Sequence, residues 1–240
     1  MNNVKKSIGW ADFTINPIKG LCPVDCKDNQ GKSYCYARRM YQRFHWNPEI
    51  RADWQETGKL PNKPSRIFVG STMELFGDWI KPEWMREIMS MPKRYPHHTF
   101  IFLTKQPQNL IKWSPFPSNC WVGVSAIDQE KMYWAIQSLQ SIKAKIKFLS
   151  LEPLLQWKSP REWLTNPLSN HLQYGGVGWL IIGQQTRAST LTRPKSEWIQ
   201  EIIDAADSAC IPIFIKDNIL KDKEIYWLKG NWNRQEFPKK

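Results

Sequence analysis

The run GWLIIGQQ, residues Gly178 to Gln185, is almost continuously apolar and then ends in two glutamines. Uninterrupted apolar character is typical of a parallel strand covered on both faces, whereas a strand with one face in water alternates. Six similar runs occur along the chain: Ser7 to Ile15, Ile67 to Thr72, Thr99 to Lys105, Trp121 to Ala126, Lys147 to Leu155 and Pro212 to Asn218. The sequence therefore predicts seven buried strands, of which the first is the weakest.

Segments with a helical pattern separate most of these strands: Tyr36 to Trp46, Pro82 to Met91, Asp128 to Ser141 and Ser196 to Ala209. Pro82 suits the first turn of a helix, and Asp128 has the side chain of an N-cap residue. Alternation of strand and helix predicts an α/β fold with right-handed crossovers, either a barrel or an open sheet. Two stretches are expected to be loop-rich insertions: Asn47 to Ser65 and Ser159 to Gly176.

Polar side chains lie at the ends of nearly all the predicted strands. They are Ser71, Thr72, Thr104, Lys105, Ser125, Glu152, Gln184, Gln185, Lys216 and Asp217. In a (β/α) barrel the carboxyl ends of the strands converge on one face, where active sites are built, whereas an open sheet spreads them along an edge. The pattern favours a (β/α) barrel, which is partial because only about six or seven parallel strands are predicted.

The length of 240 residues and the hydrophobic fraction of 41% suit one sizeable domain. We expect the barrel in residues 1–220 and a basic C-terminal extension in residues 221–240. No run approaches the ~18 continuous apolar residues of a membrane span. The basic start, MNNVKKSIGW, is not followed by the apolar run of a secretory signal. We therefore expect a cytoplasmic protein without a membrane partner.

The formal net charge of +12 favours an anionic partner, and nucleic acid, DNA or RNA, is the first candidate. The segment after the third cysteine contains Arg38, Arg39 and Arg43, which could contact a phosphate backbone. The alternative is a solvated charged helix face, and the sequence leaves both interpretations open.

The motif CPVDCKDNQGKSYCYA, Cys22 to Ala37, brings three of the five cysteines together. In a reducing cytosol such crowding indicates metal ligation by Cys22, Cys26 and Cys35. Three thiolates are one fewer than a closed [4Fe–4S] or structural zinc site needs, so one iron of a cluster would be free to bind a cofactor or substrate.

Two other interpretations of the motif stay open. One is a zinc site completed by a histidine, for which the candidates are His45, His97, His98 and His171; the other is no metal site at all. Cys120 and Cys210 stand apart from the motif, each beside apolar residues, and we expect both to be small buried hydrophobes.

Three cysteines after the first strand of a barrel, the last preceded by an aromatic residue, resemble the radical S-adenosylmethionine superfamily. The chain is more closely similar to the uncharacterised phage-associated family named for phage gene products 37 and 68. Segments that carry this resemblance are INPIKGLC, SYCYARR, FIFLTKQPQNL, WVGVSAIDQE, LSLEPLL, GWLIIGQQTR and FIKDN. One departure is that eight residues separate Cys26 from Cys35, where the superfamily usually has two. The longer loop costs only ~1–2 kcal/mol in closure entropy, so a cluster stays feasible.

The resemblance implies a [4Fe–4S] cluster that binds S-adenosylmethionine and cleaves it reductively to a 5′-deoxyadenosyl radical. It further implies an electron donor protein and an unknown substrate, which a nucleotide or nucleic acid would suit. Tyr34 matches the aromatic position beside the adenine. By position, the remaining cofactor-binding candidates are Ser71, Thr72, Glu74, Ser125 and Asp128.

Glu152, Lys105 and Lys216 are the catalytic candidates, because each lies at the end of a predicted strand. For Glu152 the alternative is a structural ion pair with Lys105 or Lys216. An alternative for the whole chain is a non-catalytic iron–sulfur or zinc protein that binds nucleic acid. A metal-free hydrolase or binding domain has less support, since the sequence contains no G-x-S-x-G, P-loop or H-E-x-x-H motif.

Overall fold

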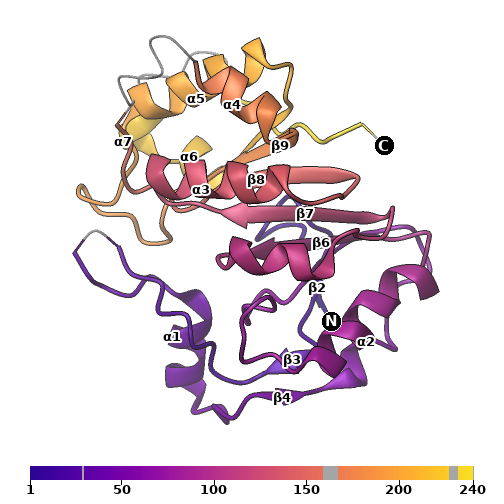
Figure 1. Ribbon diagram of the computed structural model, residues 1–240. Helices are drawn as coiled ribbons and strands as arrows, with labels where there is room; N and C mark the ends of the chain where they lie inside the picture. Colours follow the sequence, from indigo (N-terminus) through magenta and orange to yellow (C-terminus); the bar gives the residue numbers. More distant parts are fainter. Residues whose placement is uncertain (29, 159–166, 227–231, 240) are drawn as a thin grey trace. The chain divides into compact units, whose positions relative to one another are not determined.

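The computed structural model describes residues 1–28, 30–158, 167–226 and 232–239, which form two compact units (Figure 1). The first unit consists of Met1–Val122 and Lys143–Lys145, and the second of Gly123–Ile142 and Ile146–Lys240. Strand β7 (Cys120–Ser125) begins in the first unit and ends in the second. No helix among the described residues is both long enough and apolar enough to cross a membrane.

The main strands of the first unit run parallel. β5 (Arg66–Val69) pairs in parallel with both β2 (Phe13–Ile15) and β6 (Thr99–Thr104). Short antiparallel pairs accompany them: β1 (Asn2–Asn3) with β2, and β3 (Ile18–Lys19) with β4 (Arg51–Ala52). Two α-helices and two 3-10 helices complete the unit: α1 (Tyr36–Phe44), α2 (Pro82–Arg94), η1 (Trp54–Glu56) and η2 (Pro107–Trp113).

Burial explains why these segments form regular structure. The side chains of Ile67, Phe100 and Phe102 on β5 and β6 have no exposed surface, as expected for strands covered on both faces. Helix α2 begins at Pro82, as predicted, and buries Met85, Ile88 and Met91 at helical spacing. The carboxyl ends of β2, β5 and β6 therefore rest on a packed core.

The second unit repeats this plan. β9 (Val177–Ile182) lies between β8 (Ile146–Leu151) and β10 (Ile213–Ile215), and pairs in parallel with both. Its helices are α3 (Gln129–Gln140), α4 (Leu168–Tyr174), α5 (Ser196–Ser208), α6 (Asp217–Leu220) and α7 (Lys223–Tyr226). Helix α4 packs on β9 and contacts both α3 and α5.

All seven predicted strands are present, and the fold is α/β with mostly parallel strands, as predicted. α1, α2, α3 and α5 coincide with the four predicted helices. Asp128 is the N-cap of α3, where its carboxylate accepts the Lys131 N–H at 2.8 Å. The close packing of β7 on β8 requires Gly123, because a Cβ there would lie 2.3 Å from the Phe148 ring.

Two expectations need correction. The predicted loop-rich stretch from Ser159 to Gly176 contains helix α4, which was not predicted because the apolar pattern after Pro167 is short. Residues 159–166 of this stretch lie outside the described residues. Cys210 is exposed rather than buried, because it follows the end of α5 with a φ of 56°, whereas Cys120 is buried as expected.

The described part of the C-terminal segment packs on the second unit. Trp232 is only 1% exposed, Gln235 forms a β-bridge with Phe214, and the Trp179 indole N–H donates to the Glu236 carbonyl at 2.9 Å. Residues 227–231 and 240 of the predicted extension lie outside the described residues.

Candidate functional site

The described residues between Cys26 and Cys35, which are 27, 28 and 30–34, fold back as a small hairpin. Lys27 and Ser33 form an antiparallel bridge, and the Tyr34 N–H donates to the Cys26 carbonyl at 2.9 Å. Asp28, which is 8% exposed, accepts the Lys32 N–H with its carboxylate and donates its own N–H to the Lys32 carbonyl. These backbone bonds hold the two flanking cysteines, Cys26 and Cys35, side by side.

Cys26 and Cys35 are joined by a hydrogen bond in which the Cys26 thiol donates to the Cys35 sulfur. Cys35 is also the N-cap of α1, and its sulfur accepts the Arg38 N–H at 3.4 Å. The bond from Cys26, with help from the N–H groups of Arg38 and Ala37, lowers the pKa of Cys35 to about 6 despite partial burial. The same bond, together with burial, raises the pKa of Cys26.

Cys22 lies close enough to Cys35 and Cys26 to interact with both electrostatically. Burial raises the pKa of Cys22, although its sulfur receives backbone N–H groups from Glu74 and Val24. The Arg38 guanidinium donates to the Cys22 carbonyl at 3.2 Å and so ties α1 to this part of the loop.

Several donors and a cation surround the three sulfurs. Backbone N–H groups point at the sulfurs of Cys22 and Cys35, and the Lys105 ammonium acts to lower the pKa of Cys26. Such positive surroundings stabilise thiolates and tune clusters. As they stand, no three His, Cys, Asp or Glu side chains among the described residues have the spacing of a site for a single metal ion.

His45, one of the four histidines that the zinc interpretation offered, does not complete the site. His45 is exposed and is the C-cap of α1, whereas Cys35 is its N-cap. The nine-residue helix between them rises ~1.5 Å per residue, or about 13 Å in all. His45 therefore lies at the opposite end of the helix from the three thiols.

Glu74 is a buried carboxylate that joins the ends of β5 and β6. One oxygen accepts the Thr104 hydroxyl at 2.6 Å and the Phe76 N–H at 3.0 Å, and the other accepts the Lys105 N–H at 2.7 Å. Its own backbone N–H points at the Cys22 sulfur. Glu74 thus lies beside the thiols, and its carboxylate is already held by three donors.

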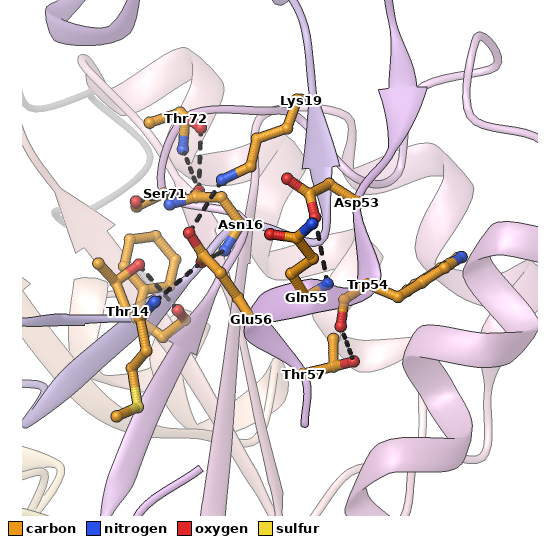
Figure 2. Close-up of polar contacts among 12 residues, drawn as sticks. Thr14, Asn16, Lys19, Asp53, Trp54, Gln55, Glu56, Thr57, Ser71 and Thr72 are labelled. Atoms are coloured by element: carbon orange, nitrogen blue, oxygen red, sulfur yellow. Dashed lines mark hydrogen bonds and ion pairs between the residues drawn. The ribbon is translucent and has the colours of Figure 1, made fainter. Parts of the chain in front are cut away.

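Asn16, which sequence reasoning missed, organises the strand end beside Ser71 and Thr72 (Figure 2). Its amide oxygen accepts the Ser71 hydroxyl at 3.2 Å, and the Thr72 N–H at 3.0 Å and hydroxyl at 2.9 Å. Its backbone N–H donates to Glu56 at 2.8 Å, and Glu56 also pairs with Lys19 at 2.9 Å. Asn16 directly follows β2, so the rule that polar residues end the strands would have found it.

In the second unit, Glu152 and Lys216 form an ion pair between the ends of β8 and β10. Gly183 allows this, because a Cβ there would lie 2.9 Å from Glu152 and 3.1 Å from Lys216. Of the two interpretations of Glu152, the structure therefore contains the ion pair, with Lys216 as its partner.

Gln184 follows β9 and is 6% exposed. Its side-chain NH2 donates to the Asn218 carbonyl and to the Asp222 carboxylate, both of which can only accept. The amide orientation is thereby fixed, and its oxygen is a buried acceptor that no described group satisfies. The neighbouring Gln185 also has a buried, unsatisfied amide oxygen. Buried acceptors of this kind suit a ligand or water that donates a hydrogen bond.

The other predicted residues of the second unit have structural partners. The Ser125 hydroxyl donates to the Glu152 carbonyl at 3.3 Å, and Asp128 caps α3 and pairs with Lys131 at 3.2 Å. Within the first unit, the structure brings together the three cysteines, Glu74 and Lys105. Of the predicted arginines, Arg38 faces the cysteine loop, whereas Arg39 and Arg43 lie elsewhere on α1.

Solved structures of spore photoproduct lyase are similar to this chain. They include the lyase complexed with a dinucleoside spore photoproduct (12% identity, TM-score 0.55), a doubly substituted variant with bound AdoMet and the same dinucleoside (11%, 0.55), and a singly substituted variant (12%, 0.56). Each comparison covers 89% of this chain and 78% of that chain. The likeness shows the fold, which is a (β/α) fold similar to that of the lyase, as predicted.

The comparison with curated proteins finds no match. A family model matches residues 5–224, which is most of the sequence, and the chain therefore belongs to the family described as Protein of unknown function (DUF5131).

Proposed function

We propose that the chain is a [4Fe–4S] enzyme that cleaves S-adenosylmethionine reductively and acts on a nucleic-acid substrate. The observation that carries the proposal is the grouping of three thiols at the N-terminus of α1. Cys26 is hydrogen-bonded to Cys35, and Cys22 lies close enough to interact electrostatically with both. Three thiolates can hold a cubane cluster and leave one iron for another ligand.

Cys22, Cys26 and Cys35 would hold the cluster. When bound, it would supply one electron to the sulfonium of S-adenosylmethionine, which yields methionine and a 5′-deoxyadenosyl radical that takes a hydrogen atom from the substrate. The N–H groups of Glu74 and Arg38 would donate to the cysteine sulfurs, as hydrogen bonds that tune such clusters do. The Glu74 carboxylate would hold the loop after β5 in position, since Thr104 and Lys105 already donate to it.

Ser71, Thr72 and Tyr34 are the proposed contacts to the cofactor. Asn16 fixes the hydroxyls of Ser71 and Thr72 by accepting a hydrogen bond from each. The lone pairs of the two hydroxyl oxygens are then left to accept hydrogen bonds from the ammonium group of S-adenosylmethionine. The main role that we assign to Asn16 is therefore to position Ser71 and Thr72. Ser125 and Asp128 remain further proposals for the ribose.

The substrate side of the proposal rests on charge and on similarity. The formal net charge is +12, and similar solved structures contain a dinucleoside and AdoMet. Glu152, Lys216 and Lys105 are proposed to contact the substrate, and the unsatisfied oxygen of Gln184 would accept an N–H or O–H from it. A cytoplasmic location and an electron donor protein go with this proposal, because free thiols and a reduced cluster need a reducing compartment. The phage association is part of the proposal through the resemblance alone.

The test is anaerobic reconstitution with iron and sulfide, followed by reduction with S-adenosylmethionine present. We expect 5′-deoxyadenosine from the wild type and from Cys120→Ala, and none from Cys35→Ala. Stoichiometric zinc without 5′-deoxyadenosine would overturn the proposal and favour a non-catalytic metal protein that binds nucleic acid.

A further inference from the structure

Helix α1 has an exposed face on which aromatic residues alternate with arginines. At 100° per residue, Tyr36, Arg39, Met40, Arg43 and Phe44 fall within one sector of the helix. The buried residues Ala37 and Tyr41 lie in the adjoining sector. Arg38 points away from this face, because its guanidinium bonds to the Cys22 carbonyl. We call the residues Tyr36, Arg39, Arg43, Phe44 and the adjoining Trp46 the α1 stripe.

The aromatic side chains of the α1 stripe are unusually accessible. Tyr36 is 61% exposed, and Phe44 and Trp46 are each 46% exposed. Phe44 stacks on Trp46 with ring centres 5.6 Å apart and planes inclined by 21°, and the Arg43 guanidinium lies 5.3 Å from the Phe44 ring. A large exposed aromatic cluster of this kind indicates an interaction site more often than an isolated exposed residue does.

The charge of the α1 stripe is entirely positive. No acidic residue occurs from Tyr34 to Trp46, and neither Arg39 nor Arg43 has an ion-pair partner among the described residues. By contrast, Arg66, Arg94, Arg193 and Arg234 are all paired with carboxylates. The two unpaired guanidinium groups are therefore available to an anionic partner.

We propose that the α1 stripe binds single-stranded nucleic acid, with bases stacked on the aromatic rings and phosphates on Arg39 and Arg43. Rings exposed between cations are the platform that sequence-tolerant single-strand binding uses, because each unpaired base offers a π face and each phosphate a charge. Tyr36 and Phe44 are eight residues apart, or about 12 Å of helix rise at ~1.5 Å per residue. That length matches three to four stacked nucleotides at ~3.4 Å each.

Double-stranded nucleic acid fits less well, since its base faces are already stacked and only its phosphates could be contacted. An acidic protein would use the arginines but would not require flat aromatic rings. The inference rests on the proposed function in that it names the substrate class, unpaired nucleotides beside the cysteine loop that Cys35 joins to α1.

The experiment measures the anisotropy of labelled 12-nucleotide single-stranded DNA, with single-stranded RNA and duplex DNA of the same sequence as further arms. Because stacking contributes strongly to such binding, Tyr36→Leu and Phe44→Leu should each weaken the affinity about tenfold. Tyr36→Phe, which keeps the ring, should restore it. The Arg39→Gln/Arg43→Gln variant should lower the slope of log K against log salt by about 1.4.

Matched controls are Trp134→Leu on α3, where the side chain is 60% exposed, and Lys93→Gln on α2. Both should bind like the wild type. Wild-type affinity of the Tyr36→Leu and Phe44→Leu variants, or equal affinity for duplex and single strand, would overturn the inference. Loss of binding only in the arginine variant would indicate electrostatic contact with phosphates without base stacking, and would overturn it too.

The assay needs neither reduction nor S-adenosylmethionine, so the two proposals can fail separately. Single-strand binding that depends on the α1 stripe, without formation of 5′-deoxyadenosine, would overturn the proposed function alone. Formation of 5′-deoxyadenosine without stripe-dependent binding would remove the inference alone.

Discussion

The cysteine hairpin of the first unit and the strand-end cluster of the second unit are both polar, but they satisfy their groups in opposite ways. Backbone N–H groups point at the sulfurs of Cys22 and Cys35, and the Cys26 thiol donates a hydrogen bond to Cys35. Glu152 and Lys216 neutralise each other instead, and Gln184 is held by groups of its own unit. We propose a bound group for the first arrangement, whereas among the described residues the second lacks partners only for the amide oxygens of Gln184 and Gln185. Groups that lack a complete set of partners are therefore a better guide to a candidate cofactor site than a high local density of charged side chains.

The largest effect should come from removing any one of the three thiols. We expect Cys22→Ala, Cys26→Ala and Cys35→Ala each to lose nearly all iron after reconstitution, because two thiolates cannot hold the cluster. Cys120→Ala, which removes a buried thiol outside the motif, should bind as much iron as the wild type. Iron and sulfide per chain are the measurement, and equal loading of all four variants would contradict the ligand assignment.

Breaking the Glu152–Lys216 pair should destabilise the second unit. The two side chains are 23% and 15% exposed, so Glu152→Gln leaves a mostly buried ammonium without its partner, at a cost of ~1–3 kcal/mol. The double variant Glu152→Gln/Lys216→Met should cost less than the sum of the single changes. Hydrogen exchange of the β8, β9 and β10 amides measures this, and strictly additive costs would show that the pair is not coupled.

A smaller effect is expected from the hairpin itself. Asp28→Ala removes the acceptor for the Gln30 and Lys32 N–H groups and should cost about 1 kcal/mol of local stability. We expect faster loss of iron to a chelator, since the hairpin holds Cys26 beside Cys35. Asp78→Ala is the control, because Asp78 lies outside the cysteine loop and forms an exposed pair with Lys112. Similar chelation rates for the two variants would contradict a special role for the hairpin.

The smallest predicted effect is a pH dependence in the second unit. Burial raises the pKa of Asp222, but hydrogen bonds from Gln184 and Arg193 outweigh it and bring the pKa below the ordinary 3.8. A carboxylate with a lowered folded-state pKa stabilises the fold fully above about pH 5, and loses this contribution as the pH falls through that pKa. Asp222→Asn should therefore cost up to about 1 kcal/mol near pH 6, and this cost should shrink as the pH falls below 3.8. A difference that stays constant with pH, measured by amide exchange around Gln184, would contradict this.

Much of the fold could be predicted from the sequence, because continuous apolar runs such as Gly178 to Gln185 reflect burial on both faces. The grouping of the cysteines was also predictable, since the motif is local. The hairpin was not, because it depends on backbone bonds such as that from Tyr34 to Cys26. Nor was the orientation of Gln184, which two distant residues of the fold impose. The choice between an ion pair and a catalytic role for Glu152 likewise needed the position of Lys216.

The central claim is that three thiols hold a cluster with one iron left open. The most direct measurement is the electron paramagnetic resonance spectrum of the reduced, reconstituted protein, recorded with and without S-adenosylmethionine. A cofactor that binds the open iron changes the electronic structure of the cluster, so we predict a clear shift of the g values on addition. A spectrum that does not change, or a protein that binds no iron, would contradict the account.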